Sequence, residues 1–127
     1  MVHAMALVKF DICIDVDDVG KAVEFYREAL GLSVLKVEPD WAQIKTGEQT
    51  FWIMKAPSGL KGSILRDYRR HWTPIHLDFV VADIEQAVKR VIQAGGRLEG
   101  EIRRSASGAL ANVSDPAGNG VDLVQRT

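Results

Sequence analysis

Asp11 and His76 are the residues of this chain whose types and positions most strongly suggest shared chemistry. Asp11 lies near the start of an alternating apolar and polar stretch at Phe10–Val16, and His76 lies near the start of a second stretch at Ile75–Val81. A shift of 65 positions carries Asp11 onto His76. Carboxylates and imidazoles are ligands for divalent metal ions. If the two stretches meet, they therefore place both groups at one site.

The elements around these two residues occur in the same order in both halves of the chain. Each alternating stretch has the period of a half-buried strand, and each is followed by an aspartate, Asp18 or Asp83, of the kind that caps a helix. Helical spacing of apolar residues then predicts helices at Val19–Leu30 and Ile84–Ala94. Turn residues divide the segment after each helix into three short strands. The predicted strands are Ser33–Glu38, Trp41–Lys45, Thr50–Lys55, Arg97–Ile102, Ala109–Ser114 and Val121–Gln125.

The similarity between the halves extends to residue identity, which indicates a duplication. The shift of 65 positions aligns Asp18 with Asp83 and Gly31 with Gly96. We therefore predict one α+β domain over 1–127 with two βαβββ modules, module one at about 8–55 and module two at about 75–125. Each module alone is too small to bury a comfortable core, so the two are expected to share one. We expect an eight-stranded, curled mixed sheet, and a ferredoxin-like βαββαβ domain is the alternative.

Strand alternation also predicts which side chains face away from the helices. The apolar set of each first strand must pack on its helix, so the other set faces a concave cup that mixes acids, aromatics and sulfur. Such a mixture is typical of a pocket and unlike either a core or an ordinary wet surface. The residues predicted to line the cup are Asp11, Cys13, Asp15, Trp41, Trp52, Met54, His76, Asp78 and Asp122.

Three segments carry a resemblance to a known family. They are Asp11–Asp18 leading to Phe25-Tyr26, then His76–Asp83, then Asp115–Gln125. Together they resemble the vicinal oxygen chelate superfamily, which includes glyoxalases, bleomycin-resistance proteins, fosfomycin-resistance transferases and extradiol dioxygenases. The resemblance runs from about Val8 to Gln125. It implies the glyoxalase/bleomycin resistance/dihydroxybiphenyl dioxygenase fold.

The resemblance also implies a ligand set for a divalent metal ion. The family's usual ligand positions correspond here to Asp11, His76 and Asp122, with Trp52 at a fourth position of less certain register. The chain departs from the family pattern, since Asp11 replaces the usual histidine, Asp122 replaces the usual glutamate, and Trp52 cannot bind a metal. One imidazole and two carboxylates suit Mn²⁺, Fe²⁺ or Ni²⁺, and are a less typical site for Zn²⁺. The alternative is that His76 is a hydrogen-bonded structural residue.

Two functions therefore stay open. One is a metal-dependent enzyme acting on a small oxygen-bearing substrate by lyase, isomerase, transferase or dioxygenase chemistry. The other is a metal-free protein that binds or sequesters a small cationic or aromatic ligand, such as an antibiotic, through Trp41, Trp52 and Met54. The sequence nominates neither a substrate nor a catalytic residue.

Composition limits the partners and the compartment. With 16 basic and 17 acidic residues the net charge is −1, so no global field favours nucleic acid or a membrane surface. The lone Cys13 and the weakly apolar start at Met1–Lys9 favour a reducing cytoplasm without a signal peptide. The family resemblance implies a homodimer. The basic cluster Arg66–His71, in the connector at about 56–74, is either a solvated and partly helical segment or an anion-binding rim of the cup.

Overall fold

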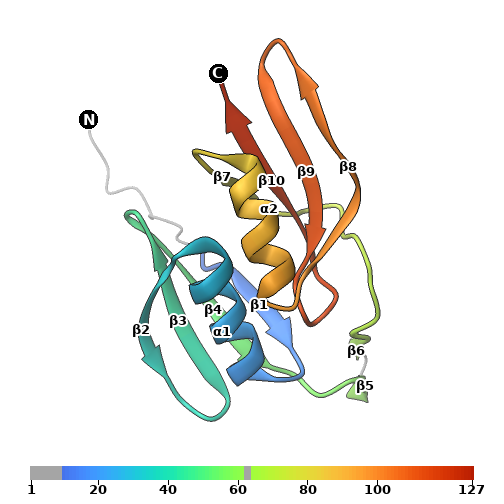
Figure 1. Cartoon of the computed structure of the whole chain (residues 1–127). Helices are drawn as coiled ribbons and strands as arrows, with labels where there is room; N and C mark the ends of the chain where they lie inside the picture. Colours follow the sequence, from blue (N-terminus) through green and yellow to red (C-terminus); the bar gives the residue numbers. More distant parts are fainter. Residues whose placement is uncertain (1–9, 62–63) are drawn as a thin grey trace, which may run out of the picture.

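The computed structural model of this protein describes residues 10–61 and 64–127. Both modules have the predicted element order, and a short hairpin lies between them (Figure 1). Module one consists of β1 (Cys13–Val16), α1 (Val19–Leu30), β2 (Ser33–Val37), β3 (Trp41–Thr46) and β4 (Gln49–Lys55). The hairpin consists of β5 (Gly59–Lys61) and β6 (Ile64–Arg66). Module two consists of β7 (Asp78–Val80), α2 (Ile84–Gln93), β8 (Arg97–Ser105), β9 (Gly108–Ser114) and β10 (Gly120–Arg126).

The two modules have the same sheet topology, as expected of a duplication. The strand orders are β1-β4-β3-β2 and β7-β10-β9-β8. In each sheet the strand before the helix is parallel to the last strand of its module, so β1 pairs with β4 and β7 with β10. The other neighbouring strands are antiparallel. Three strands after each helix exclude the ferredoxin-like alternative. The eight module strands form two four-stranded sheets rather than one continuous sheet, because no ladder joins the edge strands β1 and β7 within the described residues.

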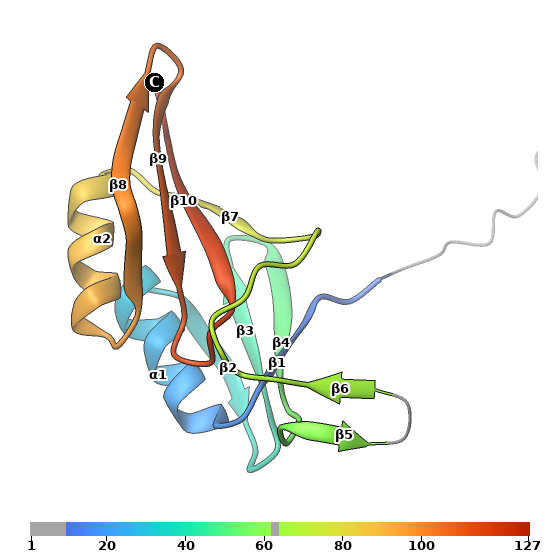
Figure 2. The ribbon, with the colours of Figure 1, turned by 90° about the vertical axis from the view of Figure 1, so that its right-hand side faces the viewer.

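The helices pack against each other on one side of both sheets (Figures 1 and 2). Their predicted N-caps are confirmed. Asp18 accepts a hydrogen bond from the Lys21 amide at 3.0 Å, and Asp83 accepts one from the Gln86 amide at 3.2 Å. Both caps have φ −135° and ψ 104°. The shared geometry shows that the helix start was retained in both copies.

The buried core lies between the helices and the inner faces of the two sheets. Its largest fully buried side chains are Val16, Phe25, Tyr26, Ile44, Ile53, Ile84, Val91, Val113 and Leu123. The predicted apolar faces are confirmed in the last strands, where Phe51, Ile53, Val121 and Leu123 are buried, whereas in the first strands only Val16 is fully buried. They are wrong at the strand starts, where Phe10 is 85% exposed and Ile75 is 86% exposed. The first strands begin only at Cys13 and Asp78, where their parallel pairing with β4 and β10 starts.

The connector crosses the side of the molecule away from the helices (Figure 2). The predicted helical character is wrong, because the described part of the connector forms the β5–β6 hairpin and irregular chain. After β6 it packs on module two, where the His71 amide donates to the Gly118 carbonyl at 3.0 Å. Among the described residues, neither helix is long and apolar enough to span a membrane.

Candidate functional site

A row of polar side chains crosses the cup face of module two. Strand pairing places Asp78 beside Asp122, Asp122 beside Asn112, and Asn112 beside Glu99, so one residue comes from each of β7, β10, β9 and β8. Paired residues of a sheet project from the same face. We call these four residues the acidic row. Asp78 and Asp122 thus share the face that strand alternation predicts for them.

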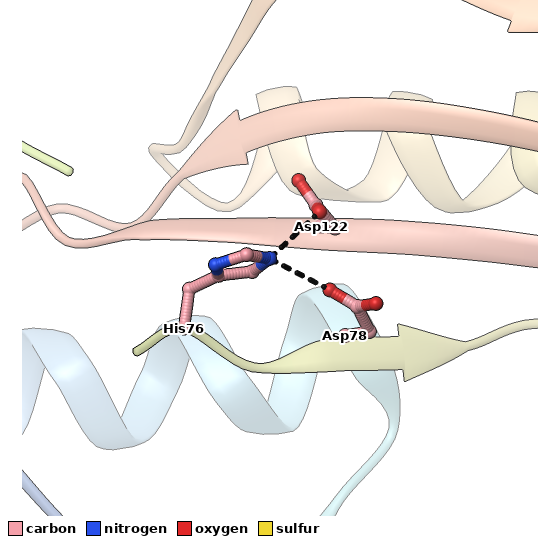
Figure 3. A group of neighbouring side chains, drawn as sticks. All are labelled: His76, Asp78 and Asp122. Carbon is pink, nitrogen blue, oxygen red and sulfur yellow. Dashed lines mark ion pairs between the residues drawn. The ribbon is translucent and has the colours of Figure 1, made fainter. Parts of the chain in front are cut away.

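His76 lies at one end of this row, two residues before β7. Its Nε2 atom is 3.1 Å from Asp122 Oδ2 and 3.2 Å from Asp78 Oδ1 (Figure 3). The side chains of His76, Asp78 and Asp122 form a group whose ligand atoms all lie within 4.8 Å of one another. Asn112 donates from Nδ2 to the other oxygen of Asp122 at 2.5 Å. That hydrogen bond holds the Asp122 carboxylate in place and leaves Oδ2 toward the imidazole.

The electrostatics of the acidic row favour a cation. The Asp122 side chain is 10% exposed and that of Asp78 is 46% exposed. Burial raises the pKa of Asp78, and the adjacent Asp122 raises it further through a hydrogen bond and charge repulsion, while His76 and Arg126 act in the opposite direction. Two carboxylates this close disfavour joint ionisation unless a positive charge lies between them. A metal ion at this point would supply that charge.

The donor set also has the spacing that a metal ion needs. Ligand bonds of about 2.1 Å at right angles put neighbouring donor atoms about 3.0 Å apart. The separations of Nε2 from the two carboxylate oxygens, 3.1 and 3.2 Å, are close to that value. One imidazole and two carboxylates are a mixed nitrogen and oxygen set, suited to Mn²⁺, Fe²⁺, Ni²⁺ or Zn²⁺. The residues present therefore fit a divalent metal ion.

The corresponding row of module one has different chemistry. There Cys13 pairs with Trp52, Trp52 with Gln43, and Gln43 with Lys36. Trp52 thus takes the place in its sheet that Asp122 takes in module two, which settles its register. The next row on the same face is Asp15, Met54 and Trp41. The five predicted pocket residues of module one, Cys13, Asp15, Trp41, Trp52 and Met54, therefore share one face.

The structure brings two of the three predicted ligands together and adds another. His76 and Asp122 are adjacent, whereas Asp11 is exposed, precedes β1 and is not part of the group. Asp78, predicted only as a pocket residue, supplies the third ligand atom. A signal for this was present in the sequence, because His76 and Asp78 are two residues apart in an alternating stretch and so share a face.

A cleft of about 1080 Å³ lies between β1 and the connector, and Asp78, Asp122, Trp41, Trp52 and Met54 are not among the residues that line it. Cys13, Asp15 and His76 line it, together with the basic cluster at 66–71. The cluster thus forms a rim of the cup, but its arginines already have carboxylate partners. Arg66 binds Asp15 at 2.9 Å and Arg69 binds Asp67 at 2.6 Å, and Arg70 pairs with Glu99. These pairs weaken the case for anion binding at the rim.

Asp115 is a structural residue whose importance the sequence pattern does not reveal. It is 3% exposed and accepts a hydrogen bond from the Tyr26 hydroxyl at 2.8 Å, which joins α1 of module one to the β9–β10 turn of module two. It also accepts from the amides of Ala117 and Asn119 at 2.9 Å. Burial raises the pKa of Tyr26, and the Asp115 charge raises it further. The turn that precedes Asp122 is therefore fixed from the core.

Comparison with known proteins identifies relatives of the whole chain. The model of the glyoxalase-like domain family matches residues 11–124. The anthracycline biosynthesis protein DauV of Streptomyces sp. (strain C5) is 30% identical over 115 residues, which make up 86% of this chain and 38% of that protein. The chain thus spans well under half the length of this relative.

Solved structures share the fold at lower identity. A hypothetical protein from S. aureus, SA1046, aligns with a TM-score of 0.71 and 20% identity over 95% of this chain and 99% of that one. The bleomycin-binding protein from Streptomyces verticillus, solved in complex with copper(II)-bleomycin, aligns with a TM-score of 0.63 and 17% identity over 98% and 100% of the two chains. At these identities the likeness concerns the fold alone.

Proposed function

Because the chain belongs to the glyoxalase-like domain family, we propose that it is a divalent-metal-dependent enzyme acting on a small oxygen-bearing substrate. The observation that carries the proposal is the convergence of His76, Asp78 and Asp122 on one point of the cup face. The sequence-based ligand set included Asp11 in place of Asp78, and the metal affinities of Asp11→Ala and Asp78→Ala distinguish the two sets. The reaction would belong to the lyase, isomerase, transferase or dioxygenase chemistry of the wider superfamily.

The residues of the cup divide the work between the modules. A divalent ion held by His76, Asp78 and Asp122 would supply Lewis-acid polarisation to adjacent oxygens of the substrate. Asn112 holds the Asp122 carboxylate in orientation through the hydrogen bond at 2.5 Å. Trp41 and Trp52, whose ring centroids lie 5.5 Å apart, offer an aromatic surface on the other module.

A second candidate function is metal-free binding of a small cationic or aromatic ligand. The pair of Trp41 and Trp52, with Met54 and Asp15 in the adjacent row, is the observation that favours it. Aromatic faces attract cations and stack on planar rings. The bleomycin-binding protein of Streptomyces verticillus shows that a binder can have this fold.

We further propose a cytoplasmic homodimer. The lone Cys13 is compatible with a reducing compartment, and the exposed apolar residues Phe10 and Ile75 offer surface for a second chain. Light scattering at micromolar concentration tests the dimer, and a monomeric mass would contradict it.

Metal binding is the test that separates the two functions. The protein is stripped with a chelator, dialysed against Mn²⁺, Fe²⁺, Ni²⁺ or Zn²⁺ in turn, and analysed for bound metal. The enzyme proposal predicts about one ion per chain for at least one of these metals, and almost none in His76→Ala. Because the change empties part of a cup rather than the core, the circular dichroism of His76→Ala should be unchanged. Absence of bound metal in the wild type would contradict the enzyme proposal and favour the metal-free binding function. Full metal content in His76→Ala would do the same.

A further inference from the structure

The indole of Trp72, in the connector, packs against the imidazole of His76. The two ring centroids are 5.5 Å apart and the rings are perpendicular. His76 precedes β7, and the nearest ladder hydrogen bond of this region runs from the Asp122 amide to the Leu77 carbonyl at 2.9 Å. Sheet pairing therefore fixes the backbone beside His76 and leaves the orientation of its ring to side-chain contacts.

Trp72 is itself held from two sides. The guanidinium of Arg70 lies over its ring at 4.6 Å from the centroid, a cation–π contact. Arg70 in turn makes a fork-like pair with Glu99, in which Nη2 donates to Oε2 at 2.7 Å and Nε pairs with Oε1. Glu99 is the last residue of the acidic row. The connector is therefore anchored on the same sheet face that carries the site.

The indole also lies against Gly120 at the start of β10. A Cβ atom built on Gly120 would lie 2.6, 2.7 and 2.8 Å from three ring atoms of Trp72, closer than real side chains approach. Gly120 is the first residue of β10 and comes two residues before Asp122. The absence of a side chain at Gly120 thus makes room for the indole beside the imidazole.

We propose that Trp72 is a positioning residue that holds the His76 imidazole with Nε2 toward Asp78 and Asp122. The inference rests on the proposed metal-dependent function. Ligating histidines are usually oriented by a hydrogen bond from their second ring nitrogen, and loss of such an orienting contact typically lowers metal affinity about 10-fold to 100-fold. Here the perpendicular indole limits the rotation of the ring, and the Arg70–Glu99 pair keeps the indole in place.

The first test measures metal affinity in matched variants of the full chain. Trp72→Ala is expected to weaken binding of the metal that the wild type takes up by about 10-fold or more, whereas Trp72→Phe retains a flat ring and should stay within about threefold. Trp41→Ala is the control, since it removes a tryptophan from the cup face of module one. Unchanged affinity in Trp72→Ala overturns the proposal, as does an equal loss in Trp72→Phe or in Trp41→Ala.

The second test needs no metal and separates this inference from the proposed function. In the chelated protein, an indole at 5.5 Å shifts the proton NMR signals of the His76 ring by its ring current. These signals, assigned by their loss in His76→Ala, are expected to move in Trp72→Ala and to stay in place in Trp41→Ala. If the wild type binds no metal, the proposed function fails and this spectrum alone decides the inference. If the His76 signals do not move in Trp72→Ala, the inference that Trp72 positions the imidazole is overturned.

Discussion

The two modules have one backbone plan and two different cup faces. In module two the row across the sheet reads Asp78, Asp122, Asn112 and Glu99. In module one the residues at the same four places are Cys13, Trp52, Gln43 and Lys36. One copy therefore offers carboxylates and the other offers an aromatic and a thiol.

The helix side of the modules shows the opposite behaviour. Both caps are aspartates with the same backbone angles, and the buried stripes of both helices consist of apolar residues. Cap and core positions are restricted by hydrogen bonding and packing, which every functional copy must satisfy. The cup face carries no such restriction, so the side chains of the two copies could diverge there.

The turns between the last two strands differ between the modules, and Asp115 in module two should give the largest effect on stability. Asp115→Ala leaves the buried Tyr26 hydroxyl and the amides of Ala117 and Asn119 without their acceptor. Each lost partner costs about 1–3 kcal/mol, so we expect the free energy of unfolding to fall by about 4 kcal/mol in urea titrations. Glu48→Ala in the exposed turn of module one is the control and should change it by less than about 0.5 kcal/mol. Equal effects of the two variants would contradict the buried role of Asp115.

Two glycines that the repeat aligns should respond unequally to alanine. A Cβ on Gly96 would lie 2.6 Å from both Phe25 Cε1 and the Ser114 carbonyl oxygen. Gly31 has open space around it and a φ of 67°. We expect Gly96→Ala to lower the free energy of unfolding by about 3 kcal/mol through overpacking, and Gly31→Ala by about 1 kcal/mol through backbone strain. Thermal or chemical denaturation measures both, and a larger loss in Gly31→Ala would reverse this comparison.

The smallest expected effect concerns the pH dependence of the metal-free protein. Burial and Asp122 raise the pKa of Asp78 in the folded state. The folded chain then retains this proton to a higher pH than the unfolded chain, so the stability linked to it is present at low pH and is lost as the pH rises through the folded-state pKa. Asp78→Asn removes that loss. Because the side chain is 46% exposed, the variant should gain less than about 0.5 kcal/mol at pH 7.

The stability gained in Asp78→Asn should shrink toward zero at about pH 3.5, where the carboxyl of the unfolded chain also carries its proton. Urea unfolding at both pH values, with chelator present, measures it. Cys13→Ser, the matched change in module one, removes no carboxylate and should show no such gain. An Asp78→Asn variant that is less stable than the wild type at pH 7 would contradict the prediction.

Local patterns were sufficient to predict the helices, their caps and the inward faces of the last strands. These features depend on residues close in sequence, such as Asp18 and the helix that it caps, and both predicted helices agree with the structure to within one residue. The duplication predicted that both modules have the same topology, because Asp11 and His76 occupy equivalent positions in the two copies.

Contacts between segments distant in sequence were not predictable in the same way. The hairpin in the connector, the bond from Tyr26 to Asp115 and the packing of Trp72 on His76 join residues with no shared pattern. The third ligand of the site, Asp78, depends on where each alternating stretch becomes a strand. β7 starts at Asp78, and its pairing sets that residue beside Asp122.

The central claim is that module two alone supplies the three metal ligands, and comparing Asp78→Ala with Asp11→Ala tests it most directly. Both changes remove one carboxylate, one from each module. Titration with the metal that the wild type binds should show about a 100-fold loss of affinity in Asp78→Ala, equivalent to about 2.7 kcal/mol. Asp11→Ala should stay within about threefold of the wild type. A large loss in Asp11→Ala with little change in Asp78→Ala would contradict the claim and show that the site spans both modules.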